Sequence, residues 1–430
     1  MRQLDNERFY LYRASTESPL TVRLTMHMDG KVDGQMLREA VDATRLRYPY
    51  LCVSLKTFRN ADGHEVAEFD DNPLPWVVTA RRKPVELLGS EANQHLMAFA
   101  WWDDCIAFDF FHAIIDGEGA YRVLRTLLYE YCRRRYDSNL SREGVWIAGD
   151  EIDPAEMTDP ATLEMPHNLS PQPVPPPPPA IDLSTCTVAP MAETSESIHI
   201  LADEEQVMHR VRSCHGTPTV WLSLLMAQAI ACLHPDSATA VPVITVPVNM
   251  RKALNVPLTH HSLVGGLFLP LSKELQDKSM EEQIARFRAL VACQTCADNI
   301  QAYFWQKKQW IDSLEQLPTL EARYQALARV NDMARQMGSC TLSYVGKANL
   351  GAAERYVLDL RTEADSPNIV TTEISAVNGK FCISFMHQLA TDAYLDAFLD
   401  QLRSQDISYE IAERHQRELP PIRNFRNITE

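Results

Sequence analysis

The stretch from Ile106 to Cys132, IAFDFFHAIIDGEGAYRVLRTLLYEYC, constrains the fold of this 430-residue chain more than any other. Its first six residues, ending at Phe111, are rich in β-formers and aromatic side chains, which predicts a buried strand. From Ala120 onward apolar residues recur at helical spacing, which predicts a long helix with one core-facing stripe. The chain must therefore build a sheet that is covered by a helix, and the two are joined through a turn around His112.

Three residues of this turn are candidates for a functional site: His112, Asp116 and Gly117. A histidine at the end of a buried strand presents its imidazole to a cleft, and its pKa lies near working pH. A buried Asp116 needs a partner, because an unpaired carboxylate would take up a proton. Gly117 permits a backbone conformation that a side chain would forbid. The alternative is that His112 is a satisfied structural residue, which is common for an isolated histidine at a strand end.

Written as a pattern, these residues give His-x-x-x-Asp-Gly, which resembles the active-site motif of the CoA-dependent acyltransferase superfamily. This group includes chloramphenicol acetyltransferase, plant and fungal alcohol acyltransferases, and the condensation domains of nonribosomal peptide synthetases. Condensation domains usually carry a further histidine just before the motif, where this chain has Phe111. The resemblance implies that His112 is the catalytic base, with Asp116 in a structural role and Gly117 as part of the motif.

A second stretch resembles the same superfamily. The apolar run from Ala240 to Val248 is followed by Asn249-Met250-Arg251, similar to the family's strand that ends in Asn-x-Arg. The resemblance implies that Arg251 pairs with Asp116 across two lobes. The alternative is a surface arginine at a strand end.

Two further stretches have a weaker resemblance to the family. Ser339 to Gly346 ends like the family's Ser-Asn-x-Gly, with Tyr344 in place of Asn, and we take Ser343 as a candidate oxyanion donor. His260-His261-Ser262-Leu263-Val264-Gly265-Gly266 imitates the two-histidine motif, but a glycine stands where the aspartate belongs. We assign no catalytic role to that second stretch.

The order of predicted elements indicates an α/β protein of the α+β type. We expect an N-terminal lobe with the motif at residues 1–160, a Pro-rich inter-lobe linker at 161–190 and a C-terminal lobe at 191–430. Five consecutive prolines from Pro175 predict an extended polyproline II segment in the linker. A ligand for a proline-recognition module is the alternative. The resemblance implies two lobes like chloramphenicol acetyltransferase, built of mixed sheets and helices and meeting in a V with the active-site tunnel between them.

Charge and hydropathy exclude several classes of partner. The formal net charge of −16 at pH 7 argues against binding of nucleic acid. Charges such as Arg2 and Asp5 interrupt the first residues, so we expect no signal peptide. The longest apolar helical run, Trp221 to Leu233, is too short to span a bilayer. We therefore expect a cytoplasmic protein without a membrane span.

The ten cysteines show no framework spacing, so the sequence predicts no disulfides. Cys293 and Cys296 form a lone C-x-x-C in a helical pattern, with no second pair to complete a zinc site. We interpret them as core-side thiols and expect no metal site.

We expect an acyltransferase that moves an acyl group from a thioester to an alcohol or amine acceptor. The co-substrate would be an acyl-CoA or a phosphopantetheine thioester, with no permanently bound cofactor. A small-molecule acceptor and an acyl or peptidyl carrier protein are the expected partners. Arg81-Arg82-Lys83 and Lys307-Lys308 are candidate phosphate contacts, although solvated charge explains each as well. Trp305 and Trp310 would line a substrate channel or pack in the core.

Two other functions remain open. One is a stand-alone condensation domain that joins carrier-tethered substrates through an amide or ester. The other is an inactive family member that binds a partner or scaffolds an assembly. Intact His112, Asp116, Gly117 and Arg251 argue against inactivity.

Overall fold

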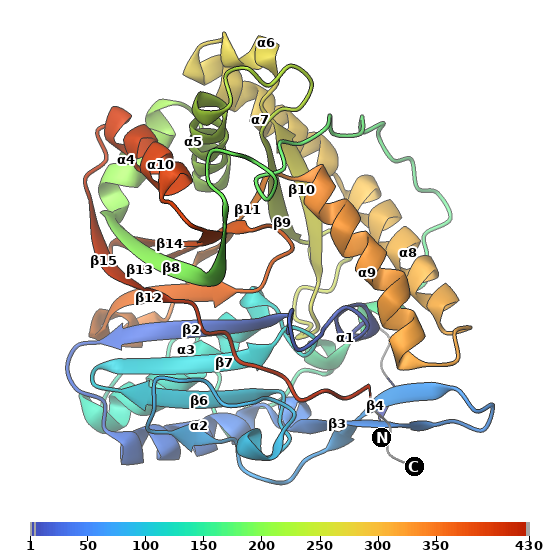
Figure 1. The fold of residues 1–430 in the computed structure, drawn as a ribbon. Coiled ribbons are helices and arrows are strands. Elements are labelled where there is room, and N and C mark those ends of the chain that lie inside the picture. Colours follow the sequence, from blue (N-terminus) through green and yellow to red (C-terminus); the bar gives the residue numbers. More distant parts are fainter. Residues whose placement is uncertain (1, 4–5, 427–430) are drawn as a thin grey trace.

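A computed structural model describes residues 2–3 and 6–426, without the side chains of 2–3 and 330–335. Two lobes lie one above the other, each built around its own sheet (Figure 1). Both sheets mix parallel and antiparallel neighbours, and helices cover the sheet face that points away from the other lobe. The predicted two-lobed, mixed α/β architecture is confirmed.

The sheet of the first lobe carries the motif strand at its centre. The strand order within the described residues is β12 (Val357–Ala364), β2 (Thr21–Met28), β7 (Cys105–Phe111), β6 (Met97–Trp102) and β5 (Val78–Thr79). Strand β2 alternates, because Leu24 and Met26 enter the core while Arg23 and Thr25 line a cavity that faces the second lobe. The core face packs against α2 (Gly34–Arg47) and α3 (Gly117–Arg135).

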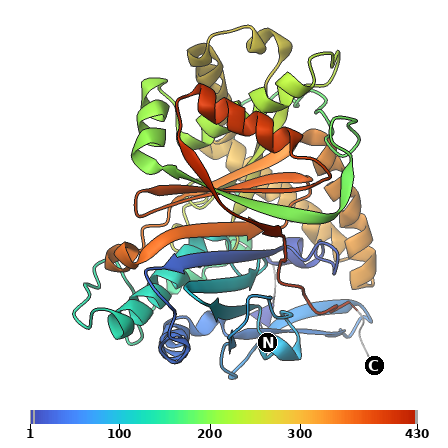
Figure 2. The same ribbon diagram turned by 60° about the vertical axis from the view of Figure 1, so that its left-hand side comes forward.

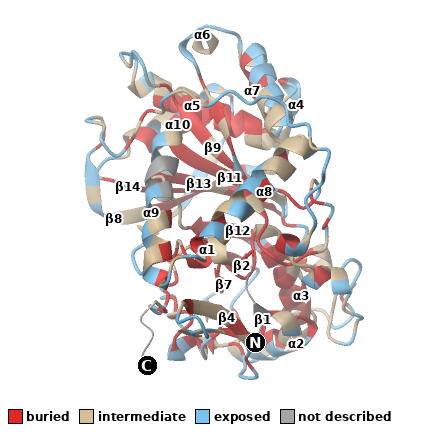
Figure 3. Cartoon of the chain, turned by 90° about the vertical axis from the view of Figure 1, so that its right-hand side faces the viewer, coloured by how far each residue is buried: buried red, intermediate tan, exposed pale blue. Residues whose placement is uncertain are grey.

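The second lobe has the larger sheet. Its order in the described chain is β10 (Val264–Pro270), β9 (Val243–Asn249), β11 (Cys340–Lys347), β13 (Val370–Val377), β14 (Lys380–Leu389), β8 (Met191–Asp203) and β15 (Tyr409–Gln416). Its outer face is covered by α4 (Glu204–Ser213), α5 (Pro218–Leu233), α7 (Met280–Gln294) and α10 (Ala393–Ser404). Helix α5 lies under the other helices and is largely buried (Figure 3), which explains its apolar sequence.

A helical hairpin of the second half reaches down to the first lobe. It consists of α8 (Ala297–Leu314) and α9 (Leu320–Met337) and meets α1 (Arg8–Leu11) near the N-terminus (Figure 1). The Arg8 guanidinium donates to the Asp312 carboxylate at 2.7 Å. Arg323 donates to the backbone carbonyl of Glu65, on the sheet formed by β1 (Arg2–Gln3), β4 (Glu65–Asp71) and β3 (Val53–Arg59). The hairpin thus holds the two lobes together on the side where α1 lies.

Short elements complete the chain. They are α6 (Lys273–Gln276) and the 3₁₀ helices η1 (Pro49–Leu51), η2 (Ser90–Ala92), η3 (Pro154–Met157), η4 (Pro160–Thr162) and η5 (Gly351–Tyr356). No single helix among the described residues has the length and apolar character to cross a membrane. Helices α4 and α5 pass that test only as a pair bent by 84°.

Two segments that follow residue 191 in the sequence lie in the first lobe. Strand β12 comes from the second half of the sequence but pairs with β2 in the first sheet. The C-terminal tail also returns to the first lobe, where Ile422 bridges to Leu87 (Figure 2). A C-terminal lobe made of all residues from 191 to 430 is therefore wrong for these two segments.

Glu156, in η3 just before the Pro-rich segment, ties three parts of the molecule together. Its carboxylate accepts two hydrogen bonds from the Arg47 guanidinium, at 2.7 and 3.1 Å, and one from the Tyr50 hydroxyl at 2.6 Å. Its backbone carbonyl accepts from the His260 amide at 2.8 Å. Glu156 and Arg47 are both buried, so their ion pair fixes the chain between the lobes.

We expect Glu156→Ala to lower the free energy of unfolding by about 3–5 kcal/mol, because Arg47 would keep a buried charge without its carboxylate. Urea unfolding followed by circular dichroism measures the change. The control is Glu91→Ala, which removes the exposed ion pair with Arg81 and should cost at most about 1 kcal/mol. Equal losses in the two variants would contradict a structural role for Glu156.

Candidate active site

His112 follows the last residue of β7 and lies at the inter-lobe face of the first lobe. Its backbone amide donates to the Leu20 carbonyl at 2.9 Å, which extends the strand pairing by one residue. The Tyr10 ring of α1 stacks on the imidazole, with 4.8 Å between ring centroids and 8° between planes. His112 as a residue is partly buried, and the stacked Tyr10 ring fixes the plane of the imidazole.

Ser262 fixes which imidazole nitrogen carries the proton. The Ser262 hydroxyl donates its single hydrogen to the backbone carbonyl of His112, and its oxygen lies 3.2 Å from His112 Nδ1. Because that hydrogen is already used, Nδ1 must be the donor in the second contact. Nε2 then has a free lone pair, which is the state that a general base requires.

The surroundings also keep the imidazole neutral. Burial lowers the pKa of His112 below its ordinary value, and the charges of Arg13 and Lys307 lower the pKa further. The Asp116 carboxylate acts in the opposite direction without cancelling these effects. At pH 7 the imidazole is therefore in the form that can accept a proton.

Asp116 and Arg251, which the sequence analysis expected to pair, lie together in a buried ion pair. Arg251 Nη1 and Nη2 donate to the two carboxylate oxygens at 2.7 and 2.8 Å. The other guanidinium hydrogens go to the carbonyls of Thr259 and His261 and to the Asn249 side chain. Burial alone would raise the pKa of Asp116, but the Arg251 charge and hydrogen bonds outweigh it and lower the pKa.

Asp116 also begins helix α3. Its carboxylate accepts from the Gly119 amide at 3.1 Å, as an N-cap does, and from the Leu263 amide of the second lobe at 2.9 Å. One side chain therefore fixes both the turn after His112 and the loop of the opposite lobe.

Gly117 is needed for space and not for its backbone conformation. It does not have a positive φ, so the expectation of a conformation that only glycine adopts is wrong. A Cβ at this position would lie 2.6 Å from Val345 Cγ2 on β11. Glycine thus lets a strand of the second lobe approach the first turn of α3.

Ser343 lies on β11 two residues before Val345, so both side chains share one face of the strand. It pairs with Glu373 on β13 and the two side chains interact. Burial raises the pKa of Glu373 to about 7, although the hydrogen bond from Ser343 lowers it somewhat. The candidate oxyanion donor is therefore coupled to a carboxyl group that titrates near neutral pH.

The sequence analysis missed two contributors to the site. The stretch His260 to Gly266, to which we assigned no catalytic role, supplies Ser262 to His112 and backbone groups to Arg251 and Asp116. Tyr10 came from an N-terminal stretch without clear periodicity. A serine that lies 150 residues from the motif in sequence leaves no signal in spacing, because only the fold brings the two segments together.

Three of the five expected phosphate contacts have protein partners. Arg81 pairs with Glu91 at 2.8 Å, Arg82 pairs with Glu413, and Lys308 pairs with Asp312 at 2.6 Å. Two tryptophans proposed for a channel, Trp305 and Trp310, instead pack in hydrophobic clusters.

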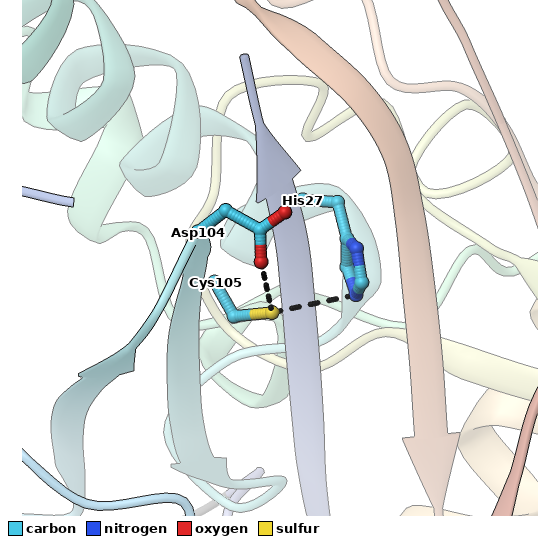
Figure 4. Close-up of side chains that lie close together, drawn as sticks. All are labelled: His27, Asp104 and Cys105. Carbon is cyan, nitrogen blue, oxygen red and sulfur yellow. Dashed lines mark hydrogen bonds between the residues drawn. The ribbon is translucent and has the colours of Figure 1, made fainter. Parts of the chain in front are cut away.

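Four groups of potential metal ligands occur among the described residues, although sequence spacing indicated none. In the group drawn in Figure 4, Cys105 Sγ lies 3.4 Å from His27 Nε2 and 3.5 Å from an Asp104 oxygen. Cys105 begins β7 and His112 follows its end, so this group lies roughly 20 Å from the imidazole. The other groups are His199, Glu363 and His415; Glu7, Asp159 and His261; and Glu196, His387 and Asp392.

No family model matches this sequence, and no curated protein matches it. Solved structures do match over nearly the whole chain. TRI101 of F. sporotrichioides, complexed with coenzyme A and T-2, is 10% identical with a TM-score of 0.61, and the match covers 95% of this chain and 99% of TRI101. The first condensation domain of the calcium-dependent antibiotic synthetase, in complex with a substrate analogue, is 12% identical with a TM-score of 0.58, over 94% and 95%.

Polyketide synthase associated protein 5 from Mycobacterium tuberculosis is 11% identical with a TM-score of 0.55, and the match covers 93% of this chain and 96% of that protein. At these identities the comparisons concern the fold. The chain shares its two-lobed fold with these three proteins.

Proposed function

We propose that this protein is an acyltransferase that transfers an acyl group from a thioester to a hydroxyl or amine, with His112 as general base. The observation that carries the proposal is the imidazole itself. Its pKa is lowered by burial, and the contact of Nδ1 with the Ser262 hydroxyl favours the tautomer that leaves the Nε2 lone pair for the acceptor's proton. The intact Asp116–Arg251 pair keeps the turn after His112 in place, which argues against an inactive relative.

In the proposed reaction the acceptor oxygen or nitrogen attacks the thioester carbonyl while its proton passes to His112 Nε2. The tetrahedral intermediate then breaks its C–S bond, and the thiolate takes the proton back from the imidazole. General-base help of this kind supplies roughly 10²–10⁴-fold. Placing both substrates at one imidazole supplies much of the rest through proximity.

Ser343 is our candidate for stabilising the oxyanion. While Glu373 is ionised, the Ser343 hydroxyl donates to it and has no hydrogen left for the substrate. Once Glu373 is protonated, the carboxyl proton goes to Ser343 Oγ, and the serine hydrogen is free for the oxyanion. The pKa of Glu373, raised to about 7, places this exchange in the physiological range.

A carrier-tethered reaction is the second candidate, since condensation domains share the fold over nearly the whole chain. The donor would then be a phosphopantetheine thioester on an acyl or peptidyl carrier protein. Phe111, buried where condensation domains usually have a second histidine, favours free acyl-CoA.

The direct test offers acyl-CoA esters from C2 to C16 together with mixed alcohols and amines, and detects free CoA by mass spectrometry. Mass detection avoids thiol dyes, which the ten cysteines would also consume. We expect acceptor-dependent CoA release that falls roughly 10²–10⁴-fold in His112→Ala, while the exposed His209→Ala control keeps the wild-type rate. Release that is insensitive to His112→Ala would refute the mechanism, and no release from any CoA ester would favour a carrier-tethered donor.

The pH dependence tests the state of the imidazole. Because the pKa of His112 is lowered from about 6.5, we expect kcat/KM with an alcohol acceptor to be highest near pH 7, and to decline above it as Glu373 ionises and takes the Ser343 hydrogen. The rate should fall as His112 becomes protonated, with an apparent pKa below about 6.5. An alcohol is chosen because an amine acceptor would titrate in the same range. An apparent pKa above 7 for the fall on the acid side would be inconsistent with a buried neutral base.

We expect Asp116→Ala to destabilise the fold by about 3–5 kcal/mol, because Arg251 would be left buried without its carboxylate. Activity should be lost with it. The control is Asp203→Ala, which removes the N-cap of α4, where the side chain accepts from the Gln206 amide, and no arginine is paired. That control should cost about 1 kcal/mol in urea unfolding. If Asp116→Ala keeps full stability and full rate, the structural role assigned to Asp116 is wrong.

A further inference from the structure

Lys307 of α8 brings an ammonium group close to the candidate base. Its Nζ lies 3.6 Å from the centroid of the Phe9 ring and 5.6 Å from that of Tyr10. The Tyr10 ring in turn stacks on the His112 imidazole at 4.8 Å. A single aromatic ring therefore lies between this cation and the imidazole, and the charge of Lys307 acts on the pKa of His112.

This ammonium lacks the partners that a half-buried lysine usually has. Within the described part of the chain, Lys307 forms neither a salt bridge nor a hydrogen bond, whereas the adjacent Lys308 pairs with Asp312 at 2.6 Å. Burial and the charge of Arg13 lower the pKa of Lys307 to about 7. The two aromatic faces compensate the charge only in part, so three N–H donors remain available to a ligand.

We propose that Lys307 is a subsite for a carboxylate that the substrate carries near its reacting group. The inference rests on the proposed function, because it assumes that the reacting carbonyl lies at His112. An anion at this position would satisfy the N–H donors and restore charge balance in a site of low polarity, where such a contact is strong.

The position argues against the phosphates of CoA as the intended anion. The phosphates are separated from the thioester by the whole pantetheine arm, while Lys307 lies one ring away from the imidazole that the thioester must reach. Two sources of a carboxylate fit this distance. One is an acyl group with a terminal carboxylate, and the other is a hydroxy or amino acid acceptor.

The test compares binding of matched ligands that differ in the carboxylate. Succinyl-CoA and butyryl-CoA, measured by calorimetry, examine the donor. The acceptor is examined with 3-hydroxybutyrate and 3-hydroxybutyramide, measured by ligand-observed NMR. We expect the wild type to favour the carboxylate by roughly 10- to 100-fold in one of the two comparisons. Lys307→Met should abolish that preference, Lys307→Arg should keep most of it, and Lys308→Met should leave it unchanged.

Two controls separate effects on stability and on catalysis from the effect on carboxylate binding. Without ligand, Lys307→Met should melt no lower than the wild type, because it removes a half-buried charge and keeps the length of the side chain. His112→Ala should lose turnover but keep the carboxylate preference, so a failure of the proposed catalytic role would not hide the subsite. Absence of a preference in both comparisons, or an undiminished preference in Lys307→Met, would overturn the proposal.

Discussion

The ion pair between Asp116 and Arg251 is the constraint on which the site depends. Both side chains are buried, so neither tolerates loss of the other. Arg251 also holds two carbonyls of the loop that follows it, and Asp116 holds an amide of the same loop. That loop contains Ser262, which orients His112. The pair therefore acts on the imidazole indirectly, since it fixes the segment that selects the tautomer.

The inter-lobe face of the second sheet carries a row of polar and charged residues. One row of paired residues crosses five strands, in the order Ser343, Glu373, Ser384, His199 and Glu413. The first sheet also contains a buried ion pair, in which Arg23 donates to Asp109 at 2.7 and 2.8 Å. Each lobe keeps an apolar core on its other face. Because each lobe has its own core, the seam between them can hold charged and polar groups.

The sequence predicted the elements whose pattern is local. The motif strand, the α3 stripe and the apolar α5 follow from periodicity, because each buries one face or all of its surface. Strands β12 and β15 were not predicted, because their sequences lack such a periodic apolar pattern. Strand β12 carries charged residues toward the polar seam, and β15 is an exposed edge strand. A strand whose buried neighbours are polar has no apolar alternation to detect.

The residues of the candidate site also fall into two groups, those that a local motif indicated and those that only the structure revealed. His112, Asp116 and Arg251 stood out through resemblance to a known motif, whereas Ser262, Tyr10 and Lys307 come from three other segments and meet only after folding. These three residues act directly on the imidazole of the motif histidine. Ser262 selects its tautomer, Tyr10 fixes the plane of its ring, and Lys307 contributes to its lowered pKa. A motif can therefore locate the histidine, but the protonation state of its imidazole depends on segments that meet only after folding.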